Sequence, residues 1–564
     1  MRLLPVIICF LIFSCSTEKE LSTIENLHIL IESLSSDNMQ GRNPGTEGGQ
    51  LAKNYISEQF SLTNLKTFDN SYFHEVPAVS STVKDSSFFT ISFRDRDRKL
   101  NYGSEVVFWS KRNIKNQKID SSNLVFVGYG IVAPEYNWND YEGIDVSGKT
   151  VVMLINDPGF DTGRLNLFNG RAMTYYGRWT YKFEEAAKQG AAAAIIIHEE
   201  EAAAYPWSVV ENSWTGPQLD LQRKDLGMSR TILESWISID VADEIFTFTG
   251  FNYDLLKEFA LDKTFQAFEM KGLSLTSNIN SDISYFSSHN LIGYKEGVSQ
   301  PDEYLIFMAH WDHLGVNKDL TGDQIFNGAA DNAAGVAAVI ELARKFDQVQ
   351  TERSIIFTAL TLEESGLLGS AYLAENPPVD LANIVAGFNF DRILPTGKTK
   401  DMAVIGYGAS ELEDILEAEL EKEGRYINPD PNPEKGYFYR SDHISFAKKG
   451  VPVLYADDGF DLEIGGVIVY FSLIILDRRF GIDDPVGAIS AHGVVGIWGV
   501  MAVVFTGGSL VDQFVGVVAI AGFTYVMSLL TILFIDRFIT IRATDAEQEL
   551  GLDASEIGVK STTY

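Results

Sequence analysis

Apolar and polar residues alternate with a helical period in two segments near the start of the chain. Residues 24–33 and 48–60 repeat Ile, Leu, Tyr or Phe every three or four positions, which predicts two amphipathic helices. The segment Gly41–Thr46 between them is rich in turn residues and predicts a loop, and it lacks the spacing of a phosphate-binding loop. We expect α/β structure up to about residue 115.

A second segment, from about residue 120 to 275, contains continuous apolar runs. They predict strands over residues 124–130, 150–155 and 191–197 and a helix over residues 182–189. No cluster of metal-ligand residue types occurs here. His198 stands alone at a predicted strand end beside a run of glutamates, so we expect it to be a solvated structural residue. This segment is expected to be a module inserted into a larger domain.

Strands and helices alternate from residue 276 to about residue 458. The pattern predicts strands over 303–309, 354–360, 384–390 and 451–456 and helices over 332–346 and 409–423. This order is typical of a mainly parallel sheet covered by helices. Beyond residue 460, residues 485–506 and 514–535 are nearly uncharged and long enough to cross a membrane. We therefore expect an all-α transmembrane C-terminal part.

The beginning of the chain predicts export. Arg2 precedes an apolar run, Leu3–Phe13, that is too short to span a bilayer. The residues Leu11–Cys15 resemble a bacterial lipobox, with Cys15 as the lipidated first residue of the mature protein. An ordinary signal peptide cleaved nearby is the alternative. Cys9 and Cys15 are the only cysteines, so the folded body has no disulfide and no Cys-ligated zinc.

Composition narrows the class of protein. The 564 residues are enough for roughly three or four domains, and 45% of them are hydrophobic. The formal net charge of -32 argues against nucleic acid as a partner, because neutralising phosphates requires clustered Lys and Arg.

The candidate chemistry lies in six residues: His310, Asp331, Glu363, Glu364, Asp391 and His443. Four of them follow predicted strands, and Asp331 opens a predicted helix. Taken singly, each has a structural explanation, such as a helix N-cap for Asp331. Together they are expected to converge, because sites in open α/β sheets form at the carboxyl ends of strands.

Imidazole and carboxylate suit zinc, and an aspartate can bridge two zinc ions. Two such ions can polarise a carbonyl and make a shared water more acidic. A carboxylate that is not a ligand can then take the proton of that water. Of the adjacent Glu363 and Glu364, one can ligate and the other can act as the base. The residues therefore predict a metal-dependent hydrolase.

The motifs around these residues resemble the co-catalytic zinc aminopeptidase family, whose relatives include glutamate carboxypeptidases and the transferrin receptor. The motifs that carry the resemblance are Ala309–His313, Gly328–Gly335, Leu362–Glu364, Phe390-Asp391 and Ser441–His443. It extends from about Asp37 to Asp458. Residues 141–149 and 176–182 resemble a protease-associated domain, which is the usual insertion in this family.

The resemblance implies two zinc ions per chain. His310 and Asp391 would bind one ion, and Glu364 and His443 would bind the other. Asp331 would bridge the two ions.

The resemblance also implies roles for the residues that do not bind zinc. Glu363 would be the general base, and Asp312 would orient the imidazole of His310. His313 receives no role and is expected to be exposed or structural. The implied reaction is the removal of an N-terminal residue from a peptide. Carboxypeptidase relatives differ in how they hold the end of the substrate, by groups that this sequence does not identify.

Residues 464–564 resemble a different family. Gly481–Gly493 and Gly496–Gly499 are similar to the last helices of an ammonium transporter. His492 corresponds to one of the two pore histidines of that family, and the helix that carries the other has no counterpart here. We therefore interpret His492 as a vestigial pore residue and expect no conduction. Arg478 and Arg479 lie in a short loop expected to face inside, which puts the peptidase-like part outside.

The expected organisation is a lipoprotein signal peptide over 1–15, a peptidase domain over 16–119 and 276–458, a protease-associated module over 120–275 and a transmembrane fragment over 459–564. The predicted fold class is α/β. The predicted function is an exported, membrane-associated di-zinc aminopeptidase acting on peptides. The join to the tail is interpreted as a gene-fusion accident or assembly error. The alternatives are an inactive binding protein on the same fold, or a transport protein with a peptidase-like ectodomain.

Overall fold

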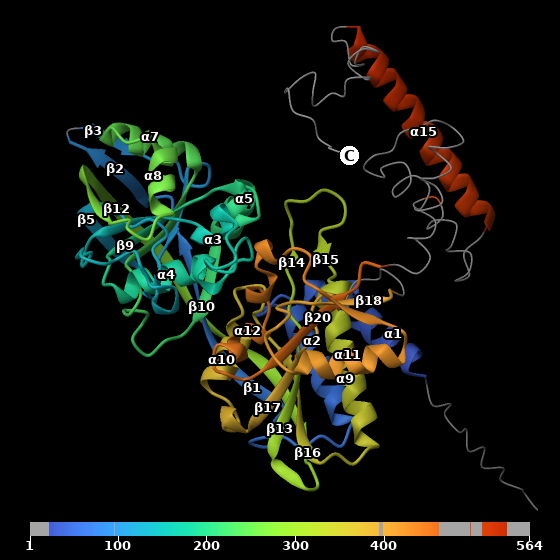
Figure 1. Ribbon diagram of the computed structural model, residues 1–564. Coiled ribbons are helices and arrows are strands. Elements are labelled where there is room, and N and C mark those ends of the chain that lie inside the picture. The colour runs from blue at the N-terminus through green and yellow to red at the C-terminus, as the bar shows by residue number, and fades with distance from the viewer. Residues whose placement is uncertain (1–21, 95, 394–398, 462–496, 498–509, 538–564) are drawn as a thin grey trace, which may run out of the picture. The chain divides into compact units, whose positions relative to one another are not determined.

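The computed structural model describes residues 22–94, 96–393, 399–461, 497 and 510–537. They belong to two compact units that divide between Phe460 and Asp461. In the first unit, the long strand β12 (Phe268–Lys295) joins a main sheet to an inserted module, as Figure 1 shows. The first half of β12 pairs with strands of the module, and the second half pairs with the main sheet.

The main sheet has the strand order β1, β12, β16, β13, β17, β20, β18, β19. Besides β12, its strands are β1 (Phe73–Val83), β13 (Gln300–His310), β16 (Arg353–Leu360), β17 (Ile384–Asn389), β18 (Asp401–Val404), β19 (Tyr426–Pro429) and β20 (Val453–Asp458). Strands β16, β13, β17 and β20 run parallel to one another, whereas β12 and β18 pair antiparallel with their neighbours β16 and β20. The mainly parallel sheet expected from residue 276 onward is confirmed.

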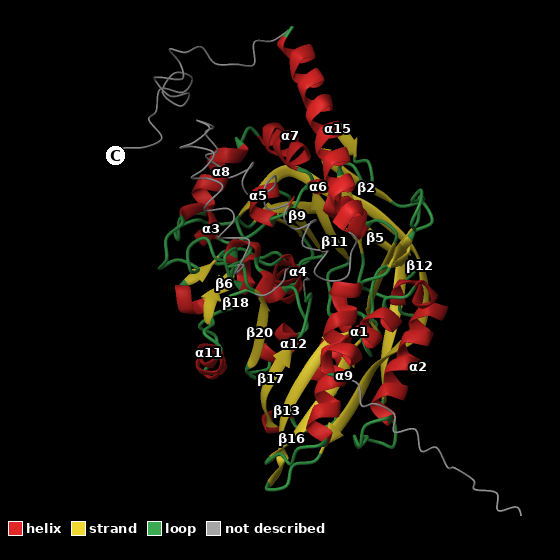
Figure 2. Cartoon of the chain, turned by 90° about the vertical axis from the view of Figure 1, so that its right-hand side faces the viewer, coloured by secondary structure: helices red, strands yellow, loops and turns green. Residues whose placement is uncertain are grey.

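Helices cover both faces of the main sheet (Figure 2). They are α1 (Thr23–Leu34), α2 (Glu47–Ser61), α9 (Ala334–Asp347), α10 (Leu368–Glu375), α11 (Leu412–Lys422) and α12 (His443–Ala447). Leu30 of α1, Phe60 of α2 and Ile340 of α9 belong to the same buried core as Phe357 of β16. Helices α10 and α12 add Leu373 and Phe446 to a second core that includes other residues of β13 and β16. The central strands are buried on both sides, which explains their uninterrupted apolar runs.

The inserted module also has an α/β structure, with parallel strands at the centre of its sheet. Its parallel strands are β5 (Asn116–Phe126), β8 (Thr150–Leu154), β9 (Ala193–Ile197) and β11 (Leu233–Ile237). Its other strands are β2 (Phe88–Phe93), β3 (Arg96–Lys99), β4 (Val106–Trp109), β6 (Val132–Ala133) and β7 (Trp138–Asn139). Its helices are α3 (Pro158–Thr162), α4 (Trp179–Lys188), α5 (Glu200–Ala203), α6 (Trp207–Trp214), α7 (Ile239–Thr249) and α8 (Tyr253–Ala260).

Strand pairing moves the start of the module earlier than the expected residue 120. Strands β2 and β4 pair with β12 and β11 of the module, so residues 88–109 belong with it. Within the module, β10 (Pro217–Leu221) returns to the edge of the main sheet and pairs with β1. Sequence periodicity did not show this, because antiparallel pairing joins segments that are far apart in the chain.

Several element boundaries differ from the sequence-based expectation. The predicted strand over 124–130 ends at Phe126, because Gly128 and Gly130 adopt positive φ angles of 56° and 65°. The helix expected from Asn332 begins at Ala334, after a turn in which Asp331 has an extended φ of -120°. These differences amount to a few residues and leave the order of elements unchanged.

The second unit contains the helix α15 (Leu510–Asp536). Its segment Gln513–Thr531 is apolar and long enough to cross a membrane, the one such helix among the residues that the structure describes. The other expected span, 485–506, lies outside the described residues apart from Ile497. The expected signal peptide with Cys15, and the expected pore residue His492, also lie outside them.

Candidate metal centre

The predicted site residues from the sheet converge at one of its edges. His310 is the last residue of β13, Glu363 and Glu364 follow β16, and Asp391 follows β17. These three strands are parallel and adjacent, so their carboxyl ends lie side by side. Asp331, in the turn before α9, lies beside them through its contact with His310.

The imidazole of His310 is buried and faces two carboxylates. Its Nε2 atom is 3.1 Å from Oδ1 of Asp331 and 3.2 Å from Oδ1 of Asp391. Its Nδ1 lies 3.1 Å from the backbone carbonyl oxygen of Asp312, to which an Nδ1–H group donates. That hydrogen bond leaves Nε2 as the ring nitrogen that faces the two carboxylates, and Nε2 is the atom that could ligate a metal ion held between them.

The candidate ligand atoms form two neighbouring groups. One group contains His310, Glu363 and Asp391, and in each group the ligand atoms lie within 4.8 Å of one another. The other contains Asp331 and Glu364 together with a residue to which the sequence assigned no role, His313. The Nδ1 atom of His313 is 2.6 Å from Oε1 of Glu364, and its side chain is only 11% exposed. Of the two roles expected for His313, exposed or structural, the exposed one is therefore wrong.

Glu363, the expected base, occupies an environment that favours its protonated form. Burial raises the pKa of Glu363 well above its usual value, His310 opposes this, and the nearby Asp391 and Asp442 raise it further. A carboxylate with a raised pKa holds a proton more readily, which suits a residue that receives a proton and passes it on.

His443 begins α12 and is completely buried. Neither of its ring nitrogens has a hydrogen-bond partner among the described residues. The ring packs against Phe438 and Tyr455, with centroids 4.9 Å away in both cases. Burial lowers the pKa of His443 to about 4, so the imidazole is neutral. Burying an unpaired imidazole is costly, and a bound metal ion would offset that cost. His443 lies outside the two groups of ligand atoms described above, and the residue types of those groups together with His443 fit zinc.

Asp312 lies beside the imidazole of His310, as the expected orienting role requires, but meets it with its backbone carbonyl. Its carboxylate lies 3.9 Å from Nδ1 of His310, so its backbone carbonyl, and not its side chain, orients that imidazole. The buried carboxylate instead accepts the backbone N–H groups of Glu363 and Glu364, at 3.1 and 3.4 Å. Asp312 therefore holds the loop that carries both glutamates.

Arg42 is a structural support of the site that sequence patterns did not identify. Its guanidinium is fully buried and donates to the backbone carbonyls of Leu34, Trp311, Asn327 and Gly328, at 2.6 to 2.8 Å. It ties the loop after β13 to the loop before α9. The only sequence signal is a charged residue inside a glycine- and proline-rich turn.

Replacing Arg42 with methionine is expected to destabilise the protein and the site together. The change removes four charge-assisted hydrogen bonds from buried carbonyls, which we expect to lower the free energy of unfolding by about 3 kcal/mol. The measurement is urea unfolding alongside zinc affinity. The control Arg164→Met changes an exposed arginine of the module. Equal stability of the Arg42 and Arg164 variants would contradict the assigned role.

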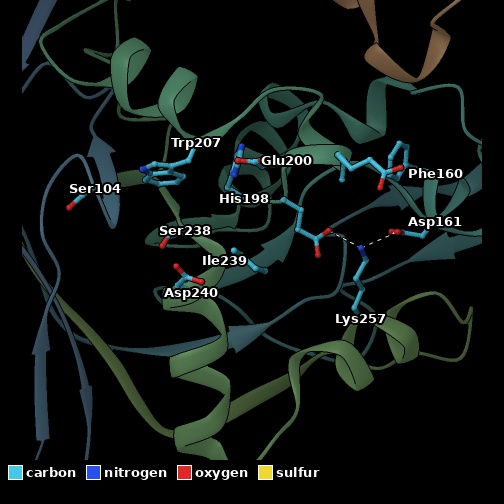
Figure 3. Close-up of a pocket in the computed structure, with 13 residues that line it drawn as sticks. Ser104, Phe160, Asp161, His198, Glu200, Trp207, Ser238, Ile239, Asp240 and Lys257 are labelled. Atoms are coloured by element: carbon cyan, nitrogen blue, oxygen red, sulfur yellow. Dashed lines mark hydrogen bonds and ion pairs between the residues drawn. The ribbon is translucent and has the colours of Figure 1, made fainter. Parts of the chain in front are cut away.

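The module contains a pocket of its own, with a volume of about 560 Å³ (Figure 3). It lies where β9 and β11 end, at His198 and Ser238. Lys257 bridges Asp161 and Glu199 in its wall, at 3.0 and 2.7 Å. His198 is buried, and its Nε2 is 3.0 Å from the carbonyl oxygen of Tyr205. The expected solvated role of His198 is therefore wrong, although a structural role stands.

Comparisons with known proteins divide the chain in the same way. Residues 290–465 match the model of peptidase family M28, and residues 463–562 match the Ammonium Transporter Family. A probable zinc metalloprotease of Pyrenophora tritici-repentis is 36% identical over 104 residues, which are 18% of this chain and 24% of that protein. An ammonium transporter of Bacillus subtilis is 30% identical over 115 residues, which are 17% of this chain and 28% of the transporter.

A solved structure of similar fold is the aminopeptidase from Aneurinibacillus sp. strain AM-1. It is 18% identical, with a TM-score of 0.44, over 78% of this chain and 86% of that chain. The chain thus spans about a quarter of the length of the two curated relatives described above.

Proposed function

Residues 290–465 match peptidase family M28, and on that premise we propose that this chain is a di-zinc aminopeptidase. The observation that carries the proposal is the position of His310 Nε2, within 3.2 Å of one oxygen each of Asp331 and Asp391. The buried and unpartnered imidazole of His443 supports it.

The proposed metal ligands are His310 and Asp391 for one ion, Glu364 and His443 for the other, and Asp331 as the bridge. His313 lies close enough to Glu364 to be a further candidate ligand or to orient it. When bound, zinc supplies Lewis acidity, which polarises a peptide carbonyl and makes water more acidic.

The residues of this chain perform the proton transfers. Glu363 takes a proton from the attacking water as the water oxygen adds to the carbonyl carbon. It then gives that proton to the leaving nitrogen as the peptide C–N bond breaks. The carboxylate of Asp312 holds Glu363 in place by accepting a hydrogen bond from the backbone N–H of Glu363. The products are a free N-terminal amino acid and a shortened peptide.

Removing the metal tests this proposal on the full chain. We expect about two zinc ions per chain and release of N-terminal residues from short peptides. A chelator should abolish turnover, and added zinc should restore it. Product analysis separates an aminopeptidase from a carboxypeptidase, because the first releases the N-terminal residue. Bound zinc without any turnover would favour the alternative of an inactive binding protein.

The C-terminal part of the chain supports a proposal of membrane association. Residues 463–562 match a family of membrane transporters, and α15 carries an apolar segment long enough to span a bilayer. We propose that this part holds the chain at a membrane, with the peptidase part exported. Conduction is not proposed, since the match covers 28% of the transporter. Sedimentation of the full chain with membranes, and its release by detergent, is the measurement that checks this.

A further inference from the structure

Three neighbouring parallel strands of the inserted module lead into the pocket that Figure 3 shows. Asp161 lies in α3, which follows β8, while His198 directly follows β9 and Ser238 directly follows β11. Ligand sites in open α/β sheets form at the carboxyl ends of strands. The volume of about 560 Å³ is within the range of roughly 300–1,000 Å³ that is common for ligand pockets. The module pocket is therefore placed and sized to bind a ligand.

One side of the module pocket already has its charges balanced. Lys257 forms ion pairs with Asp161 and Glu199, at 3.0 and 2.7 Å. These two carboxylates also accept hydrogen bonds from the hydroxyl groups of Tyr129 and Tyr253, at 2.6 and 2.7 Å. This side of the module pocket is complete without a ligand.

The remaining polar groups of the module pocket include acceptors without partners. Glu200 and Asp240 are exposed and line the pocket, and neither carboxylate has an ion pair or a hydrogen bond among the described residues. Asp240 lies in the first turn of α7, where its charge offsets the positive end of the helix. The uncompensated charge at this side is negative, which favours a cation as the ligand.

His198 adds an acceptor at the floor of the module pocket, where it is 2% exposed. Its Nε2–H group donates to the carbonyl oxygen of Tyr205 at 3.0 Å. Burial lowers the pKa of His198, which favours the neutral imidazole with a single N–H group. Nδ1 is then an acceptor, and it has no hydrogen-bond partner within the described part of the chain. A ligand that donates hydrogen bonds would complete it.

Aromatic and aliphatic side chains form the rest of the wall. The ring of Trp207 lies 5.5 Å from the ring of His198, and its Nε1–H group donates to the carbonyl oxygen of Gly103 at 3.0 Å, which fixes its orientation. Phe160 and Ile239 contribute further apolar surface. The face of a tryptophan ring attracts cations, and a long basic side chain can lay its methylene groups along apolar surface.

The spacing of the acceptors favours an extended cation over a metal ion. Among the described residues, ligand atoms of three or more histidine or acidic side chains lie within 4.8 Å of one another in two groups, both at the candidate metal centre. The acceptors of the module pocket therefore do not converge on one ion. A guanidinium carries five N–H donors spread over a planar fork and stacks on aromatic rings.

We propose that the module pocket binds the guanidinium group of an arginine side chain in a peptide. The guanidinium would donate to Nδ1 of His198 and to the carboxylates of Glu200 and Asp240, with the ring of Trp207 beside it. The proposal goes beyond the proposed peptidase function, because none of the candidate metal ligands lines this pocket. Binding here requires neither zinc nor cleavage.

Calorimetric titration of the full chain in detergent tests the proposal with N-acetylglycyl-arginyl-glycinamide. The acetyl group prevents an aminopeptidase from removing the first residue. The matched peptide has citrulline in place of arginine, which keeps the size of the side chain and removes its charge. We expect the arginine peptide to bind about tenfold or more tightly than the citrulline peptide. Propylguanidine tests the source: equal affinity identifies a free guanidinium compound, and a tighter peptide identifies an arginine side chain.

A pair of double variants tests whether the module pocket causes the preference. In Glu200→Gln with Asp240→Asn, the ratio of the two affinities should fall to less than about threefold. The matched control is Glu258→Gln with Asp254→Asn in α8, which makes the same chemical changes at exposed positions and also removes a first-turn aspartate of a module helix. The control should keep the wild-type ratio.

Four results would overturn the proposal. They are equal affinities of the arginine and citrulline peptides for the wild type, a ratio unchanged in the pocket variant, a ratio lowered equally in the control, and a lysine peptide that binds as tightly as the arginine peptide. The third and fourth would reduce the effect to general attraction by an acidic chain. Because binding is measured without turnover, a failure of the peptidase function leaves this test unchanged.

Discussion

Replacing Glu363 with glutamine is expected to leave zinc bound and to lower kcat by about 10³-fold. Glutamine has nearly the same size and keeps the backbone N–H that donates to Asp312. It cannot take a proton from water, so the general base is lost while the fold and the metal ligands remain. Metal analysis and steady-state kinetics on short peptides make the measurement.

The control for this variant is Glu352→Gln, at an exposed glutamate beside the opposite end of β16, which should behave as wild type. Full turnover in Glu363→Gln would mean that the assigned base is wrong. Loss of zinc together with activity would instead make Glu363 a ligand, which its place beside His310 and Asp391 permits.

Replacing Asp331 with alanine is expected to abolish zinc binding and turnover together. The Oδ1 atom of Asp331 lies 3.1 Å from Nε2 of His310, and the carboxylate also belongs to the group that contains Glu364. It is therefore the residue placed to join both halves of the site. We expect activity to fall by about 10³-fold or more, because polarisation of the carbonyl and activation of water are lost at once.

Metal content and unfolding in a chelator make this second measurement. The metal-free variant should unfold within a few degrees of the metal-free wild type, since the loss concerns zinc and not the fold. Asp319→Ala, an exposed aspartate in the loop between His310 and Asp331, is the control and should keep its zinc. A variant of Asp331 that kept about two zinc ions per chain would remove the bridging role.

The two substitutions together discriminate between ligand and base. Glu363→Gln should separate metal binding from turnover, whereas Asp331→Ala should abolish both. If the chain were an inactive binding protein, the wild type itself would show no turnover. The wild-type chain with zinc and turnover is therefore the reference for both comparisons.

Much of the fold and most of the candidate site followed from the sequence. The apolar runs that became β13, β16 and β17 are largely buried, as expected for parallel strands with helices on both faces of the sheet. Residues that follow such strands must meet at one edge of the sheet, so the convergence of His310 and Asp391 was predictable from order alone. Residue chemistry then indicated zinc.

The tertiary structure decided which side chains meet across long separations in the chain. Arg42 donates to the backbone carbonyl of Trp311, 269 residues away, and the sequence around Arg42 does not predict that contact. The pairing of His313 with Glu364 and the contact of the Asp312 carboxylate with the backbone N–H of Glu363 are of the same kind. Periodicity and turn chemistry are local properties, and they determine elements and their ends. Partners across elements depend on the packing of whole segments, which a local pattern does not specify.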